Sequence, residues 1–173
     1  MLSLLRESSG PQALKTAQFD LAELLEDLVE TVNYEIGDGP EQIELKLTAP
    51  LVLEADRELL WRVFENLLRN ALIHSGDGGG IAVLADQAAD EEIQVRVVDS
   101  GPGIAHNQID RIFEPFYRVD EARHRDSGGH GLGLAIAASA VRRHGGRISA
   151  ANHESGGLEV RVVLPVSQQQ DRT

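Results

Sequence analysis

Residues 126–146 read "DSGGHGLGLAIAASAVRRHGG", and four glycines occupy the six positions from Gly128 to Gly133. An apolar pattern with helical spacing follows at once. Glycine clears side chains from the start of a helix, where unpaired backbone N–H groups and the helix dipole favour phosphate oxygens. Two interpretations are open at this point: a loose loop that ends at a helix, or a helix N-terminus that admits an anionic ligand.

The composition is that of one globular domain. The chain has 173 residues, of which 42% are hydrophobic and 25% charged, and this is ordinary for a soluble protein with a buried core. A net charge of −12 without a basic stripe argues against a nucleic-acid surface. The absence of cysteine excludes disulfides, thiolate metal sites and a cysteine nucleophile. Because no apolar run approaches the roughly 20 residues that span a bilayer, we expect no membrane contact by this chain.

Helices and strands are predicted to alternate in a regular order. Apolar residues at helical spacing predict helices over residues 19–36, 56–75 and about 132–144, with Asp20 and Asp56 as N-caps. Strands are predicted in adjacent pairs, 43–47 with 51–55, 81–86 with 93–100, and 147–152 with 158–165. We therefore predict an α/β fold, a two-layer sandwich in which a mixed, largely antiparallel sheet is covered on one face by about three helices.

The domain organisation predicted from these patterns has three parts. Residues 1–18 are interpreted as a helix tail and a loose linker, residues 19–166 as the domain, and residues 167–173 as a flexible tail. Within the domain, the connection from residue 101 to residue 131 holds only one short helical pattern, near residues 108–113. Loops beyond about 12–15 residues are uncommon in compact domains, so this connection is predicted to be a hinged lid.

Two asparagines on the second predicted helix form a candidate site. Asn66 and Asn70 are four residues apart and therefore share one helix face. Asparagine is a mediocre helix former, and polar side chains on a mostly apolar segment need partners. They are interpreted either as caps for neighbouring loops or as amide oxygens presented to Mg²⁺, which prefers oxygen ligands and is commonly shared with substrate phosphates.

The segment "VVDSGPG" ends an apolar strand at Asp99. A carboxylate in this place either caps a turn or accepts a hydrogen bond from an exocyclic amine. In the second interpretation, Gly101 and Gly103 allow a flat ring to approach the backbone.

Together these motifs resemble the ATP-binding fold of sensor histidine kinases, gyrase-type topoisomerases, Hsp90 chaperones and mismatch-repair ATPases. The segment "NLLRNALIHS" is similar to the N box, "DSGPG" to the first glycine box, "FEPFYR" to the F box and "GGHGLGLAIA" to the second glycine box. Their order resembles the histidine kinase branch, over about residues 19–165. The stretch "FEPFYRVDEARHRDSGGHGLGLAI" is similar in particular to Cpx-type envelope-stress sensor kinases.

The resemblance implies a role for individual residues. Asn70 is expected to coordinate Mg²⁺ with Asn66 beside it at the phosphates, and Asp99 is expected to accept the adenine amino group. Arg118 and Arg123 are expected to contact phosphate from the lid. The other residues implied in ATP binding line the adenine slot or the phosphate side, and they are His74, Gly101, Gly103, Ile104, Tyr117, Gly129, His130, Gly131, Leu132, Gly133 and Leu134.

The chain departs from the family in two ways. Many relatives carry a basic residue three positions after the second N-box asparagine, where this chain has Ile73. The phosphoacceptor box, roughly H-E-L-R-T-P, is missing, and all six histidines are interpreted as surface or lid residues. The resemblance then implies a catalytic and ATP-binding domain of a larger kinase, with "LSLLRE" as the end of its dimerisation helix.

Three rival functions are alternatives to this interpretation. A gyrase- or Hsp90-like hydrolase would need a carboxylate base one turn before the metal-binding asparagine, but that residue is Asn66. A serine kinase of the anti-sigma type has a similar fold in a shorter chain. A non-catalytic nucleotide-binding module is disfavoured because Asn70, Asp99 and both glycine boxes are intact.

The function implied by the resemblance is that of an ATP-dependent protein-histidine kinase domain in a two-component system. The γ-phosphoryl group would pass to a histidine on a separate dimerisation domain, with a response regulator as the partner of the parent protein. The isolated domain is expected to be a monomer and the parent a homodimer. The domain is expected to be the cytoplasmic part of an inner-membrane sensor.

Overall fold

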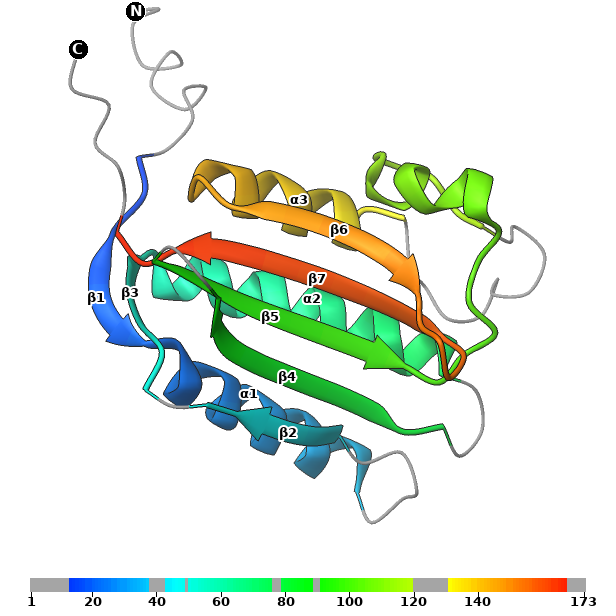
Figure 1. The fold of residues 1–173 in the computed structure, drawn as a ribbon, viewed down its shortest axis with the longest axis horizontal. Helices are drawn as coiled ribbons and strands as arrows, with labels where there is room; N and C mark the ends of the chain where they lie inside the picture. Colours follow the sequence, from blue (N-terminus) through cyan, green and yellow to red (C-terminus); the bar gives the residue numbers. More distant parts are fainter. Residues whose placement is uncertain are drawn as a thin grey trace, which may run out of the picture.

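The computed structural model describes residues 13–37, 43–48, 50–75, 79–88, 91–119 and 131–167. These residues form a sheet with helices on one face, as predicted (Figure 1). The helices behind the sheet are α1 (Leu21–Ile36), α2 (Arg57–His74) and α3 (Gly133–Arg143).

The main sheet has five strands in the order β2-β4-β5-β7-β6. Its strands are β2 (Ile43–Leu47), β4 (Ile81–Ala88), β5 (Glu92–Asp99), β6 (Arg147–Asn152) and β7 (Leu158–Pro165). All neighbours are antiparallel except β2 and β4, which run parallel. The predicted mixed, largely antiparallel sheet is therefore confirmed, including the hairpin pairings of β4 with β5 and of β6 with β7.

The prediction that residues 43–47 pair with residues 51–55 is wrong. Strand β3 (Val52–Ala55) leaves the main sheet and pairs with β1 (Ala17–Asp20), a strand in a segment that was interpreted partly as linker. Strand β2 pairs instead with β4, with Ile43 opposite Ile81. Parallel neighbours need a long crossover connection, and the chain through β3 and α2 supplies it.

Both predicted N-caps are confirmed. Oδ1 of Asp20 accepts the backbone N–H of Ala22 at 2.9 Å, and Oδ1 of Asp56 accepts that of Leu59 at 3.1 Å. Asp20 also accepts the backbone N–H of Leu51 at 2.9 Å, which joins the start of α1 to the start of the segment leading into β3. Each cap satisfies donors that a helix cannot pair internally.

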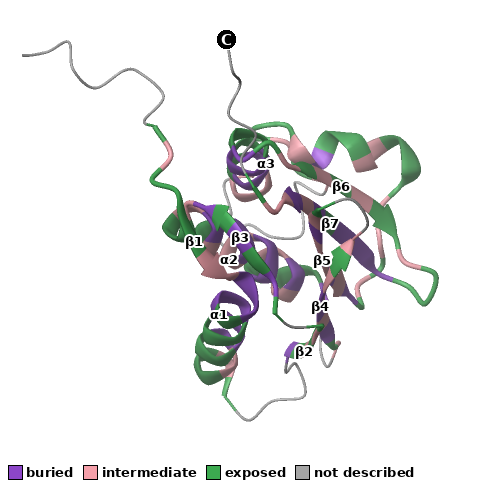
Figure 2. Ribbon diagram, turned by 60° about the vertical axis from the view of Figure 1, so that its left-hand side comes forward, coloured by how far each residue is buried: buried purple, intermediate pink, exposed green. Residues whose placement is uncertain are grey.

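The core lies between the sheet and the helices, where buried residues face one another (Figure 2). Alternate residues of β4, β5 and β7 point inward, as the period of two in a strand requires. Helix α3 contributes mainly small side chains to this layer. Its buried residues are Ala135, Ala137, Ala138, Ala140 and Val141.

None of the helices in the described ranges is both long enough and apolar enough to cross a membrane.

The predicted lid is described only at its two ends. A 3-10 helix, η1 (His106–Phe113), takes the place of the short helical piece predicted near residues 108–113. Residues 120–130 lie outside the described ranges, and so do residues 1–12, which include the predicted end of a dimerisation helix.

Candidate nucleotide-binding site

Asn66 and Asn70 lie half-buried on the face of α2 that leads to the start of α3. A Cβ placed on Gly133 would stand 3.4 Å from Oδ1 of Asn66, so the side chain of Asn66 faces the first residue of α3. In the described part of the chain, neither asparagine amide has a hydrogen-bond partner. The interpretation that they cap neighbouring loops is therefore not supported.

Asp99 is buried at the end of β5, and backbone donors hold its carboxylate. Oδ1 accepts the N–H of Gly101 at 2.9 Å and the N–H of Leu158 at 3.1 Å. Among the described residues, the second oxygen accepts no protein hydrogen bond. The carboxylate is thus oriented by one oxygen while the other can meet a donor from outside the protein.

Sequence reasoning missed the contribution of the β6–β7 hairpin to this carboxylate. Gly157 has a φ of +85°, and a Cβ on it would collide with the backbone oxygen of Asp99. Only glycine combines this backbone conformation with so close an approach. The pair Gly156–Gly157 was visible in the sequence, but nothing local connected it with Asp99.

The loop after Asp99 packs against the last turn of α2. A Cβ on Gly101 would collide with the backbone oxygen of His74, whose side chain is exposed, and Gly103 adopts a φ of +70°. The amide of Asn152 holds the loop from β6: its Oδ1 accepts the N–H of Ile104 at 2.9 Å, and its Nδ2 donates to the Ile104 carbonyl at 2.7 Å. This role of Asn152 had no sequence signal.

The lid returns to the start of α3 through Gly131. The backbone N–H of Phe116 donates to the carbonyl of Gly131 at 2.9 Å, and Gly131 itself has a φ of +67°. A Cβ on Gly131 would stand 3.0 Å from the carbonyl oxygen of Tyr117, whose ring stacks on the guanidinium of Arg111 with 4.3 Å between that group's carbon and the ring centroid. Arg118 is exposed beside them.

The structure describes some of the remaining predicted residues and not others. Leu132 and Leu134 flank Gly133 at the start of α3 and are half-buried. Three predicted site residues lie outside the described ranges, and they are Arg123, Gly129 and His130. The prediction that all six histidines are surface or lid residues is wrong for His144, which is 1% exposed.

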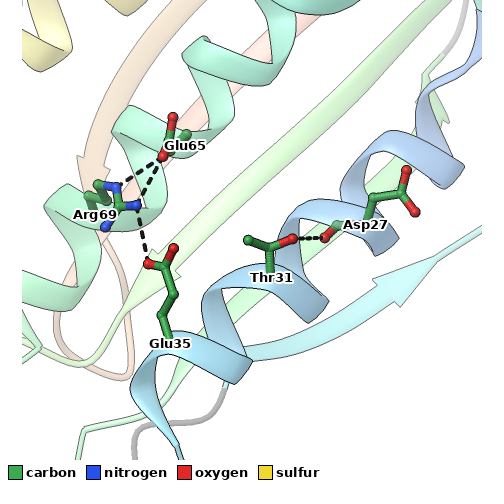
Figure 3. Close-up of polar contacts among 5 residues, drawn as sticks. All are labelled: Asp27, Thr31, Glu35, Glu65 and Arg69. Atoms are coloured by element: carbon green, nitrogen blue, oxygen red, sulfur yellow. Dashed lines mark hydrogen bonds and ion pairs between the residues drawn. The ribbon is translucent and has the colours of Figure 1, made fainter.

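Glu65, the acidic neighbour of Asn66, is turned away from α3. Its carboxylate accepts two hydrogen bonds from Arg69, at 3.2 and 3.0 Å, and Arg69 also contacts Glu35 of α1 at 3.2 Å (Figure 3). The hydrogen bond from Arg69 to Glu65 is the main cause that raises the pKa of the arginine. Glu65 is thus engaged in an ion-pair network between two helices.

The described residues hold no cluster of three histidine or acidic side chains that would form an all-protein metal cage. A magnesium ion shared with phosphates does not require one, because it keeps several waters and takes only one or two protein ligands. The open amides of Asn66 and Asn70 fit that pattern.

A hollow of about 500 Å³ on the uncovered sheet face, lined in part by Ala82 and Val98, touches Asp99 but neither asparagine.

Comparison with known proteins shows which family the chain belongs to. Residues 55–168 match the family described as histidine kinase-, DNA gyrase B-, and HSP90-like ATPase. The signal transduction histidine-protein kinase BaeS of Escherichia coli (strain K12) is 35% identical over 163 residues, which cover 94% of this chain and 35% of BaeS. The sensor histidine kinase CpxA of the same strain is 35% identical over 155 residues, which cover 90% of this chain and 30% of CpxA.

Solved structures show the same relationship. The nucleotide-free catalytic domain of histidine kinase ThkA aligns with a TM-score of 0.79 at 26% identity, over 90% of this chain and 98% of that domain. ThkA in complex with the response regulator TrrA aligns with a TM-score of 0.77 at 26% identity, over 91% of this chain and 43% of that one. The chain spans about a third of the length of the curated relatives BaeS and CpxA. It therefore belongs to the family of histidine kinase-, gyrase- and HSP90-like ATPases, as a catalytic domain of the sensor histidine kinase type.

Proposed function

We propose that this domain binds Mg–ATP between α2 and α3 and transfers the γ-phosphoryl group to a histidine on a separate dimerisation domain. The observation that carries the proposal is a row of residues on α2, from Asn66 beside the start of α3 to His74 beside the loop after Asp99. Residues four apart share a helix face, so Asn70 lies between them. The row is about 12 Å long at the helical rise of 1.5 Å per residue.

The adenine is assigned to the end of this row near Asp99. The second oxygen of Asp99, which accepts no hydrogen bond from the described part of the chain, is suited to the exocyclic amino group of adenine. Gly101 lets the loop after Asp99 pack against the His74 carbonyl, and Gly103 adopts a φ of +70°. The loop is thereby held beside Asp99, where a flat ring is proposed to lie, with Ile104 as an apolar surface.

The phosphates are assigned to the other end, at the start of α3. The helix begins at Gly133, where backbone N–H groups and the helix dipole favour anionic oxygens. Asn70 is the proposed Mg²⁺ ligand, with Asn66 beside it, and the bound ion would neutralise charge on the phosphates. Arg118 and Arg123 are proposed to add positive charge from the lid.

Phosphoryl transfer is favoured over hydrolysis because, among the described residues, no carboxylate stands at the position where a hydrolase needs its general base. A hydrolase of this fold would need a carboxylate at the position of Asn66, and an amide takes no proton at neutral pH. The adjacent carboxylate of Glu65 is held by Arg69 and faces α1 (Figure 3). The nucleophile is therefore proposed to come from another domain.

The surface for that domain is proposed to include Phe116. This side chain is 73% exposed, and its backbone is hydrogen-bonded to Gly131 at the phosphate end. A large exposed apolar side chain beside a site is typical of a protein contact. The parent is proposed to be a homodimeric inner-membrane sensor with this domain on the cytoplasmic side and a response regulator as its partner.

Incubation of the chain with Mg²⁺ and ATP labelled on the γ-phosphate tests the proposal. We expect ATP binding, but neither a labelled chain nor appreciable free phosphate. Addition of the histidine-bearing hairpin of the parent should label the hairpin alone, and slowly, because the effective concentration that a covalent tether provides is lost. A hairpin whose acceptor histidine is replaced by glutamine is the control and should stay unlabelled.

Other outcomes identify the rival functions. Stable label on the chain itself would favour a serine kinase. Rapid phosphate release that Asn66→Ala abolishes would favour a hydrolase. Binding of ATP with no transfer to the hairpin would favour a non-catalytic module.

A further inference from the structure

His144 is a buried histidine that directly follows the last residue of α3. Its Nδ1 lies 2.8 Å from the carbonyl oxygen of Ala140, and its Nε2 accepts the backbone N–H of Asp56 at 3.1 Å. A carbonyl only accepts and a backbone N–H only donates, so the ring is the neutral tautomer with its proton on Nδ1. Burial is the main cause that lowers the pKa of His144, and the positive charge of Arg143 acts in the same direction, while the Ala140 hydrogen bond and the Asp56 carboxylate oppose it.

Asp56 connects this ring to the beginning of α2. Its Oδ1 caps the helix at Leu59, and its Oδ2 accepts the backbone N–H of Lys15, at 3.0 Å, from the segment that leads into β1. The hydrogen bond from Asp56 to His144 therefore ties the start of α2 to the end of α3.

The two helices run antiparallel and meet again at the nucleotide site. Ten positions separate Asp56 from Asn66 on α2, and eleven separate His144 from Gly133 on α3. At the rise of an α-helix these spans are about 15 Å and about 17 Å, so the two spans are similar in length. One pair of ends is joined by the His144 hydrogen bond, and at the other pair Gly133 faces Asn66.

The buried face of α3 between these ends is formed mainly by small side chains. The buried residues of α3 are four alanines and Val141. Helices keep their relative position by fitting ridges of side chains into grooves, and alanines make shallow ridges. A buried polar contact with one suitable partner is a known way to specify register.

We propose that His144 is a positioning residue that sets the axial register of α3 on α2, and through it the separation of Gly133 from Asn66 at the phosphate site. The inference rests on the proposed nucleotide binding between these helices. The axial register is proposed to depend on Nε2 as a hydrogen-bond acceptor. A protonated ring carries a hydrogen on Nε2 and no longer accepts there.

Titration of Mg–ATP into variants of the full chain, well below their melting temperatures, tests the proposal. His144→Leu keeps the bulk but removes the acceptor, and we expect affinity to fall about five- to tenfold, at the low end of the usual range of couplings between sites. His144→Gln offers an amide oxygen to the Asp56 N–H and should recover most of the loss. The matched control is Val32→Ala, which truncates a buried side chain of α1, a helix without site residues, and should lower Tm without changing affinity.

A second measurement uses pH and does not depend on the leucine variant. The affinity of the wild-type chain relative to His144→Gln should be constant from about pH 8 to the ordinary histidine pKa of about 6.5. It should fall only at the lower pH at which the buried ring takes a proton, because only the histidine titrates. Asp56 and Arg143 are charged residues that act on the ring, and the wild-type chain and His144→Gln share them. Other protonation events near the nucleotide cancel in the ratio.

The outcomes separate this inference from the proposed function. A wild-type chain that binds no Mg–ATP would contradict the proposed function itself. If the wild-type chain binds, the positioning role is overturned by unchanged affinity in His144→Leu, by an equal loss in Val32→Ala, by a glutamine variant as weak as the leucine variant, or by a ratio that is constant with pH.

Discussion

The backbone N–H of Leu158 donates to Oδ1 of Asp99 over 3.1 Å, although the two residues are 59 positions apart. With the N–H of Gly101 on the same oxygen, two backbone donors determine which way the carboxylate points. The β6–β7 hairpin thus determines the orientation of a residue that lies at the end of β5.

This arrangement makes Asp99→Asn informative about base choice. The two backbone donors require an oxygen at the Oδ1 position, so the amide nitrogen of the variant must occupy the other position and present a donor. We expect ATP affinity to fall by about 1–3 kcal/mol, the cost of a mismatched buried polar group. GTP, whose ring carries a carbonyl oxygen at the place of the adenine amino group, should gain relative to ATP. Competition titrations measure both, and a wild-type chain that binds GTP as well as ATP would contradict the assignment.

Gly157→Ala is expected to displace the backbone of Asp99. The new Cβ would collide with the backbone oxygen of Asp99, and the residue also has a φ of +85°. We expect a loss of stability of more than about 1 kcal/mol, because both the conformation and the space are unsuitable. ATP affinity should fall as well. Urea unfolding and calorimetric titration give the two quantities.

The neighbouring Gly156 provides a control for that substitution. Its φ is +95°, but a Cβ there meets nothing within 4 Å. Gly156→Ala therefore bears only the conformational strain and should leave ATP affinity unchanged. Equal losses of affinity in the two variants would show that strain in the hairpin, and not displacement of Asp99, is responsible.

Asn70→Ala is expected to remove the metal dependence of ATP binding. If the Asn70 amide oxygen is the protein ligand of Mg²⁺, the variant should bind ATP nearly equally with Mg²⁺ and with a chelator, and its Tm should change little. Ile73→Ala is the control, because Ile73 is 41% exposed on the same helix. A variant that keeps the metal dependence of the wild type would show that another residue holds the ion.

The free energy of unfolding should fall with decreasing pH over a pH range set by His144. The pKa of His144 is lowered by burial in the folded chain, so between the folded and unfolded pKa values the unfolded chain binds more protons. The contribution of His144 is then complete above its usual pKa of about 6.5 and is lost as pH falls through the lowered value. Urea unfolding from neutral pH to about pH 5 measures it, and His144→Gln should lack this step.

A separate loss is expected at lower pH from Asp56. Burial acts to raise the pKa of Asp56, but hydrogen bonds from the backbone N–H groups of Lys15 and Leu59 act in the opposite direction, and the pKa lies below its usual 3.8. Its contribution should persist through the His144 window and disappear only below about pH 4. A wild-type chain and a His144→Gln variant with parallel profiles between neutral pH and pH 5 would contradict the role of the histidine.

The helices and hairpins of this protein were predictable because their causes are local. Asp20 and Asp56 cap donors within three residues, and the apolar period of α1 and α2 is visible within each segment. The same holds for the β4–β5 and β6–β7 pairs, whose partners are joined by short turns. The asparagines of α2 and the glycine-rich start of α3 were likewise recognisable as motifs.

The sequence by itself thus determined the helices, the hairpins and the motifs of the nucleotide site. Only the tertiary structure decided that β1 pairs with β3, that β2 joins β4 in parallel, and that Asn152 and Gly157 contact the loop after Asp99 and Asp99 itself. It also moved His144 from the expected surface into a buried junction with Asp56, 88 positions away. Such contacts depend on which distant segments bury one another's apolar surface, and a four-residue strand or a single histidine carries no periodic signal that identifies its partner.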